Sequence, residues 1–258
     1  MADKTELGSV DLHTDSKGIA TITFEHPAHN SLPGKLLAKL ADTITQAGQD
    51  DAVKVIILRS GGDRTFCAGA SFDELISIKD FETGKRFFMG FANVINAMRK
   101  CPKFIIGRVQ GKAVGGGVGL CAAMDYCVAT QWASVKLSEL AIGIGPFVVG
   151  PAVERKVGTS AMTQLAINAT EWKTAEWAQH KGLFTEVFDT TDQQDAYISS
   201  LAEKLAASNP EAMMRLKQVF WEDAAGWDEL LEARAAMSGQ LVLSDFTVKA
   251  IEKFKQKA

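Results

Sequence analysis

A glycine-rich segment, Ala113–Gly119 (AVGGGVG), has residue types that suggest chemistry. Glycine has no Cβ atom, so consecutive glycines leave room for a ligand beside the backbone and let several N–H groups point into one pocket. The residues that follow, Leu120–Ala123, favour a helix, whose positive dipole end would attract negative charge. The segment therefore predicts a site for an anion, either a phosphate or an oxyanion.

The spacing of these glycines also bears on nucleotide-binding motifs. A P-loop is excluded, because no GxxxxGK[ST] pattern follows. Gly117, Gly119 and Ala122 match a dinucleotide-binding GxGxxA pattern, with Glu139 downstream at about the right distance. However, the helix is too short for a dinucleotide-binding unit, and the motif lies well past the end of the preceding strand. A purely structural role, close packing between backbone segments, stays open.

A second segment of small residues, Phe66–Leu75 (FCAGASFDEL), follows an apolar strand-like run. Alone it predicts little. Together with VQGKAVGGGVGL some forty residues later, it resembles the crotonase family of enoyl-CoA hydratases and isomerases. In that family an F-x-A-G-A segment and a G-x-x-x-G-G-G segment each contribute one N–H group to an oxyanion hole for a thioester. Matched residue by residue, the resemblance implies the N–H groups of Ala70 and Gly116.

Further matches in the correct order strengthen this resemblance, which extends from about residue 18 to residue 186. They are PAHNSL at 27–32, Cys101-Pro102-Lys103, Asp125, and KLSELAIG at 136–143. The resemblance implies an α/β crotonase (ClpP-like) fold, a spiral of ββα repeats with a C-terminal helical region. It also implies an acyl-CoA thioester substrate, no cofactor beyond the coenzyme A of that substrate, and a homotrimer or dimer of trimers. The substrate-binding residues that it implies are Ala68, Ser71, Phe72, Gly117, Gly119 and Phe147.

One departure from the family pattern bears on the reaction. The family's hydratases use two glutamates, one in G-G-G-x-E and one in P-E-x-x-I-G. This chain has the second as Glu139, but Gly119 stands at the first position. A single carboxylate near an apolar acyl chain can take a proton from C2 and return it at C4, while the oxyanion hole stabilises the dienolate. This pattern resembles the Δ3-Δ2-enoyl-CoA isomerases, and burial would raise the pKa of Glu139 to suit it.

Several alternatives stay open. Phe147, after Pro146, would narrow and dry the site as in mitochondrial-type isomerases, or it simply fills core space. Glu139 would otherwise be a carboxylate at a helix N-terminus, after Ser138. The enzymatic rivals are an enoyl-CoA hydratase, with a branched substrate and a differently placed partner for Glu139, and decarboxylation or hydrolysis of a thioester. A rival from another class is a non-catalytic acyl-CoA-binding module.

The periodicity of the chain predicts the elements that position these residues. Strands are expected at 18–24, 55–58, 104–109 and 126–129, and helices at about 36–49 and 81–99. This alternation favours an α/β core. After Gly143 nearly every segment favours helix: 147–157, 160–168, 173–181, 192–207, 210–222 and 227–243. We therefore expect a core over residues 1–195 and a helical region over 196–258 that makes trimer contacts.

Composition narrows the class of protein. The 258 residues are 47% hydrophobic and carry a net charge of −3, which gives no reason to expect nucleic acid as a partner. Cys67, Cys101, Cys121 and Cys127 form no CxxC pair, and the four histidines do not cluster with them, so neither a metal site nor a disulfide framework is expected. The N-terminus lacks the features of a secretory signal, and no apolar run is long enough to span a membrane. We expect a cytoplasmic protein.

Overall fold

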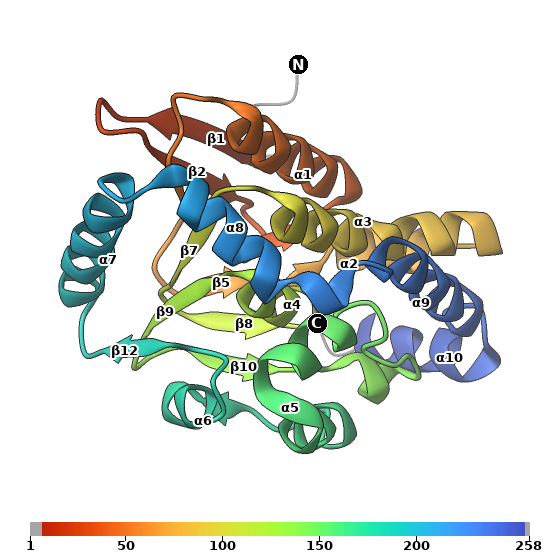
Figure 1. The fold of residues 1–258 in the computed structure, drawn as a ribbon. Helices are drawn as coiled ribbons and strands as arrows, with labels where there is room; N and C mark the ends of the chain where they lie inside the picture. The colour runs from red at the N-terminus through yellow and green to blue at the C-terminus, as the bar shows by residue number, and fades with distance from the viewer. Residues whose placement is uncertain (1–6, 256–258) are drawn as a thin grey trace.

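A six-stranded sheet forms the centre of the computed structural model, which describes residues 7–255 (Figure 1). The first two strands in the chain form an antiparallel hairpin, and all other neighbours in this sheet are parallel. The strand order is β1-β2-β4-β7-β9-β12. The bounds are Ser9–Thr14 (β1), Ile19–Glu25 (β2), Val55–Ser60 (β4), Phe104–Val109 (β7), Tyr126–Thr130 (β9) and Glu186–Phe188 (β12).

Two smaller sheets lie beyond the carboxyl ends of these parallel strands. A four-stranded sheet has the order β11-β10-β8-β5, and β3 pairs with β6 in parallel. The glycine-rich segment begins at Ala113 in β8 and continues into α4 (Gly116–Ala123), whose eight residues are all buried. The bounds are Ser31–Leu32 (β3), Thr65–Cys67 (β5), Gly69–Ala70 (β6), Lys112–Val114 (β8), Ser134–Lys136 (β10) and Lys173–Thr174 (β11).

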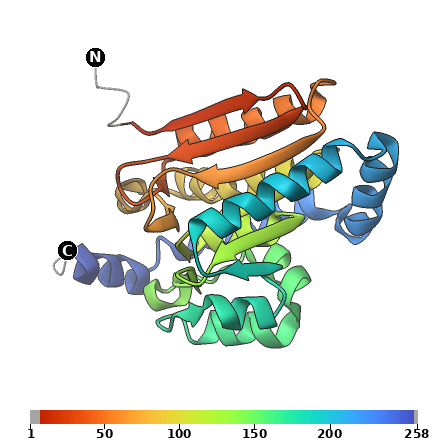
Figure 2. The ribbon, with the colours of Figure 1, turned by 90° about the vertical axis from the view of Figure 1, so that its left-hand side faces the viewer.

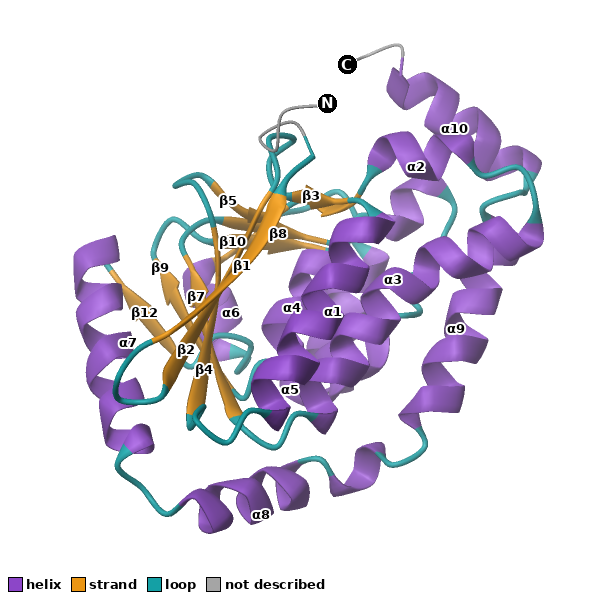
Figure 3. Ribbon diagram, turned by 90° about the horizontal axis from the view of Figure 1, so that it is seen from above, coloured by secondary structure: helices purple, strands orange, loops and turns teal. Residues whose placement is uncertain are grey.

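Helices cover both faces of the large sheet (Figure 3). Alternate residues of a buried strand point to opposite faces. In β4, Ile56 therefore packs into the main core with α1 and α3, whereas Val55 packs with Ile198 and Ala202 of α7. The helices are α1 (Gly34–Gln49), α2 (Phe72–Ser77), α3 (Phe81–Lys100), α4 (Gly116–Ala123), α5 (Gly150–Ile167), α6 (Ala175–His180), α7 (Thr191–Ala206), α8 (Pro210–Phe220), α9 (Trp227–Leu241) and α10 (Asp245–Lys255), with single 3₁₀ turns η1 (Glu139–Ile142) and η2 (Glu222–Ala224).

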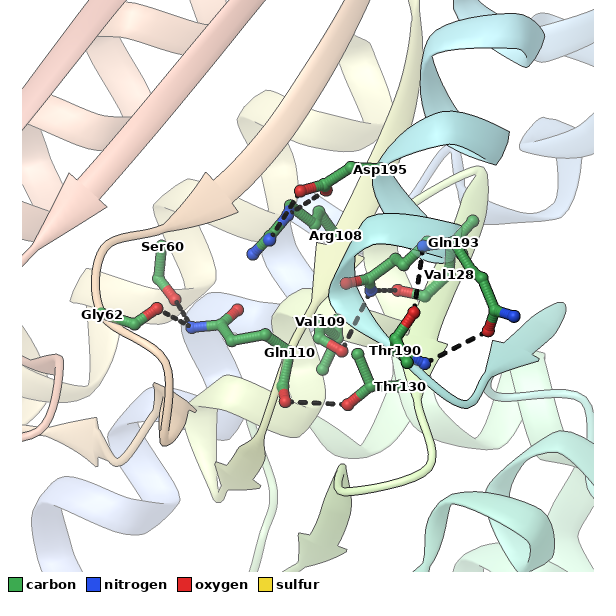
Figure 4. Close-up of polar contacts among 11 residues, drawn as sticks. Ser60, Gly62, Arg108, Val109, Gln110, Val128, Thr130, Thr190, Gln193 and Asp195 are labelled. Atoms are coloured by element: carbon green, nitrogen blue, oxygen red, sulfur yellow. Dashed lines mark hydrogen bonds and ion pairs between the residues drawn. The ribbon is translucent and has the colours of Figure 1, made fainter.

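Polar contacts hold α7 on its face of the sheet (Figure 4). The guanidinium of Arg108 on β7 makes a two-point ion pair with Asp195. The buried amide of Gln194 donates to the carbonyls of Val109 and Val128. Gln110, the residue after β7, joins β7 to β4 by donating to Ser60 Oγ. The Gln194 bonds satisfy backbone carbonyls of β7 and β9, and together with the Arg108–Asp195 pair they fix the position of α7.

A buried ion pair joins the C-terminal helices to the core. Lys217 of α8 lies 2.8 Å from Asp125 Oδ2, and both side chains are almost fully buried. The Asp125 carboxylate also accepts hydrogen bonds from Ile105 N and Trp221 Nε1, while Lys217 donates to the Lys103 carbonyl. Every charge in this cluster is therefore paired, as burial requires.

The C-terminal helices curve around the molecule (Figure 3), and α10 projects beyond it (Figure 2). Helix α9 packs along α3, and α10 reaches η1. No helix in residues 7–255 has the length and apolar character needed to cross a membrane.

Most predicted elements of the sequence are present. The strand predicted at 104–109 is β7, and the helices predicted at 36–49 and 81–99 are α1 and α3. The helices predicted at 147–157 and 160–168 correspond to the two parts of α5, which meet at Gly158, where the backbone is not helical and φ is 75°. The sequence did not predict β1 or β12 of the large sheet, the short strands of the two smaller sheets, or helices α2 and α10. The expected boundary between 195 and 196 falls inside α7.

Candidate active site

The two glycine-containing segments, Phe66–Leu75 and Ala113–Gly119, meet at the ends of short strands. A Cβ atom at Gly69 would lie 3.1 Å from the Val114 carbonyl oxygen and 3.8 Å from Gly116 N. Gly69 also has a φ of 94°, a conformation that favours glycine. Glycine at this position therefore lets β6 and the β8–α4 connection approach closely.

Gly116 is the first residue of α4, where backbone N–H groups have no partner within the helix. The N-cap, Gly115, has a φ of 53°. A Cβ atom at Gly116 would lie 2.3 Å from the Phe91 ring, so packing requires glycine here. Ala70, in β6, is held by the pairing of β6 with β3 and by a bond from Ser31 Oγ to its carbonyl.

Glu139 lies next to these two segments. A Cβ atom at Gly115 would be 3.0 Å from Glu139 Oε1. Oε2 is buried and has no hydrogen-bond partner among the described residues, although the residue as a whole is half-buried. Burial raises the pKa of the carboxyl to about 7, against a smaller opposing effect of a hydrogen bond from its own backbone N–H.

The local backbone positions the Glu139 side chain. Glu139 begins η1, which ends at Gly143 in a left-handed conformation with φ 84°. Ser138 precedes it without making a side-chain cap. The turn is closed by a backbone hydrogen bond, in which Ile144 N donates to the Glu139 carbonyl at 3.0 Å. The carboxyl group is left directed into the molecule.

A cavity of about 540 Å³ contains all of these groups. Its lining is mostly apolar, as in ligand-binding pockets generally. It brings together most of the residues that the sequence predicted: Ala68, Ala70, Ser71, Phe72, Gly116, Glu139 and Phe147. The apolar part lies around Phe87, Phe88, Phe91, Ile142, Ile144 and Val148.

Two predicted substrate-binding residues do not line this cavity. Gly117 packs against β5, where a Cβ atom would lie 2.5 Å from the Cys67 carbonyl oxygen. Gly119 faces Val149, and a Cβ atom there would lie 2.5 Å from Val149 Cγ1 and 3.4 Å from Ile95 Cδ1. For these two glycines, the structure thus favours the close-packing role that the sequence left open.

Several lining residues were not predicted. His26, His29 and Lys136 are polar, while Val149 and Ser238 come from elements far along the chain. The histidines flank a turn whose φ values, 55° at His29 and 56° at Asn30, are positive. The Asn30 amide fixes that turn by donating to the Gly61 and Thr65 carbonyls. The PAHNSL motif was the available signal, but it did not show which residues face a cavity.

Cys67 is unsuited to nucleophilic catalysis. Its side chain is fully buried, and burial raises the pKa of the thiol to about 12. The thiolate is the nucleophile, so the thiol is inert at neutral pH. In the described part of the chain, no three His, Cys, Asp or Glu side chains are grouped as a metal site would require.

Comparison with known proteins places the chain in a family. The family model described as enoyl-CoA hydratase/isomerase matches residues 14–257. The chain therefore belongs to the enoyl-CoA hydratase/isomerase, or crotonase, family. Its acyl-CoA chemistry is that of this family, which includes both hydration and isomerisation of enoyl-CoA.

The individual relatives differ in reaction. A probable enoyl-CoA hydratase of Bacillus subtilis (strain 168) is 27% identical over 253 residues, which cover 97% of each chain. The peroxisomal Δ(3,5)-Δ(2,4)-dienoyl-CoA isomerase of Arabidopsis thaliana is also 27% identical, over 93% of this chain and 90% of its own.

A solved structure shows the same fold. It is a putative enoyl-CoA hydratase from Mycobacterium avium paratuberculosis K-10, with a TM-score of 0.87 and 24% identity over 96% of this chain and 97% of its own. The predicted crotonase fold is confirmed.

Proposed function

We propose that the protein is a Δ3-Δ2-enoyl-CoA isomerase in which Glu139 moves one proton between C2 and C4 of the acyl group. The observation that carries this proposal is the packing at Gly119. Val149 and Ile95 occupy the space where a side chain at 119 would project. Gly119 therefore supplies no second carboxylate, and the packing leaves no room for one to reach the substrate from this position.

The proton transfer uses groups of this chain alone. The Glu139 carboxylate takes a proton from C2 of a 3-enoyl thioester, and the electron pair moves onto the thioester oxygen to give a dienolate. The N–H groups of Ala70 and Gly116 would donate to that oxygen. Glutamic acid at 139 then returns the proton to C4, and the double bond forms between C2 and C3.

The pKa of Glu139 supports both halves of this transfer. With a pKa of about 7, the side chain exists near neutral pH as a carboxylate that accepts a proton and as an acid that donates one. General acid–base catalysis is most efficient when the pKa lies near the working pH. The apolar lining around Phe147 and Val149 favours a proton transfer without water over an addition of water.

Hydration is the competing reaction, since the family and a relative named as a probable hydratase include it. The experiment compares 3-hexenoyl-CoA and crotonyl-CoA with the same preparation. We expect isomerisation of the first to exceed hydration of the second by at least about 100-fold in kcat/KM, or about 2.7 kcal/mol in activation free energy. Comparable or faster hydration would overturn the proposal. Tight binding without turnover of either thioester would instead support a non-catalytic acyl-CoA-binding module.

A further inference from the structure

Two lysines and a tryptophan gather on the outer face of the four-stranded sheet. In the parallel pairing of β10 with β8, Lys136 lies opposite Val114, and Lys112 shares the face of Val114 because alternate strand residues point the same way. Trp172 immediately precedes β11, the other neighbour of β10. Its ring centroid is 4.5 Å from Lys136 Nζ and 5.2 Å from Lys112 Nζ.

Neither of these two ammonium groups pairs with a carboxylate in the described part of the chain. None of the ion pairs among residues 7–255 includes Lys112 or Lys136. The Trp172 ring attracts both cations but does not neutralise them. Burial, and then the charge of Lys112, lower the pKa of Lys136. A bound anion would compensate both of these unfavourable effects.

The position of the pair relates it to the cavity. Lys136 lines the cavity together with Val114, whereas Lys112 and Trp172 lie outside its lining. The pair therefore sits at the cavity's rim. No ion pair joins Lys136 to Glu139 among residues 7–255. The lysine is thus free to serve a ligand.

We infer that Lys136 and Lys112, lying over Trp172, form an anion-binding subsite at the rim of the cavity, which takes a phosphate or carboxylate group of the thioester ligand. This inference rests on the proposed thioester ligand but not on the direction of its proton transfer. Lysine stems reach along the sheet face and place the charges beside the cavity.

Equilibrium binding tests the subsite with three probes. Butyryl-CoA carries phosphates, succinyl-pantetheine carries only a carboxylate, and butyryl-pantetheine carries neither. Titration calorimetry would compare the wild-type protein with Lys136→Met and Lys112→Met, which keep the apolar stem and remove the charge. Lys204→Met, at an exposed position on α7, removes the same charge far from the cavity.

We expect Lys136→Met to weaken binding of at least one anionic probe by about three- to tenfold, and exposed Lys112→Met to weaken it less. Loss with butyryl-CoA alone would identify phosphate as the anion, and loss with succinyl-pantetheine alone would identify carboxylate. Butyryl-pantetheine and the Lys204→Met protein should be unaffected.

Unchanged affinities of Lys136→Met for both anionic probes, or an equal loss with butyryl-pantetheine, would overturn the subsite. If the wild-type protein bound none of the three probes, the proposed thioester ligand itself would fail, and the subsite with it. Because binding is measured without turnover, a protein that binds but does not isomerise would contradict only the proposed reaction.

Discussion

At the scale of single residues, the environment of Glu139 determines its chemistry. The sequence predicted a buried carboxylate with a raised pKa, and the structure buries its Oε2 where no described residue forms a hydrogen bond with it. The resulting pKa of about 7 has two measurable consequences, one for stability and one for rate. Both follow from the preference of an apolar environment for the neutral acid.

The first consequence concerns stability. The folded pKa of about 7 lies above the ordinary value of 4.5, so ionisation opposes folding. The penalty is absent below about pH 4.5, grows between pH 4.5 and 7, and is constant above pH 7. Glu139→Gln should therefore stabilise the protein by about 3 kcal/mol at pH 8 but by only about 1 kcal/mol at pH 5. Denaturant unfolding at both pH values measures this, and a pH-independent difference would contradict it.

The second consequence concerns rate. Removal of a C2 proton requires the carboxylate form of Glu139. We therefore expect kcat/KM for 3-hexenoyl-CoA to rise with pH to an inflection near 7 and then level off. A profile measured from pH 5 to 9 checks this. An inflection near 4.5, the ordinary value for glutamate, would mean that the carboxyl is not desolvated in the free enzyme.

At the scale of elements, the site depends on contacts between segments far apart in the chain. The glycine motifs and Glu139 could be found from the sequence, because their function requires particular residue types at a fixed spacing. The sequence also showed that Gly119 carries no carboxylate. It could not show that Val149 fills the adjoining space, or that Lys136 lines the cavity. Those facts depend on how the loop before α5 and strand β10 pack against α4 and β8, which local patterns do not encode.

A double-mutant cycle tests the contact between Gly119 and Val149. Gly119→Ala places a methyl group 2.5 Å from Val149 Cγ1, and we expect it to lower the free energy of unfolding by about 1–3 kcal/mol. In the Val149→Ala background the same change should cost at least about 1 kcal/mol less. Gly226→Ala is the control, since no atom of the described residues lies within 4 Å of a Cβ there. If the two substitutions changed the free energy of unfolding additively, the side chains at 119 and 149 would not be in contact.

At the scale of the whole molecule, the C-terminal helices are part of the same packed structure as the core. Helix α9 packs along α3, Ser238 of α9 lines the cavity, and the Asp125–Lys217 pair ties α8 to β7 through Ile105. The separate helical region predicted over 196–258, with its trimer contacts, stays a prediction. The sequence suggested it because helical periodicity begins near residue 147, but periodicity carries no information about which surfaces join.

Lys217→Met tests this connection. Removing the ammonium leaves the Asp125 carboxylate buried and unpaired, so we expect a loss of about 3 kcal/mol in the free energy of unfolding. The double substitution Asp125→Asn/Lys217→Met should cost less than the sum of the two single changes. Chemical unfolding of the four proteins gives the comparison. A loss below about 0.5 kcal/mol for Lys217→Met would contradict the role given to the pair.

The central claim is that Glu139 alone carries the proton, and Glu139→Gln tests it most directly. Glutamine keeps the size of the side chain but cannot accept a proton. We predict that kcat for isomerisation of 3-hexenoyl-CoA falls by at least about 10³-fold, while the dissociation constant for butyryl-CoA changes by less than about threefold. A variant that binds butyryl-CoA and still isomerises 3-hexenoyl-CoA within about tenfold of the wild-type rate would contradict the account.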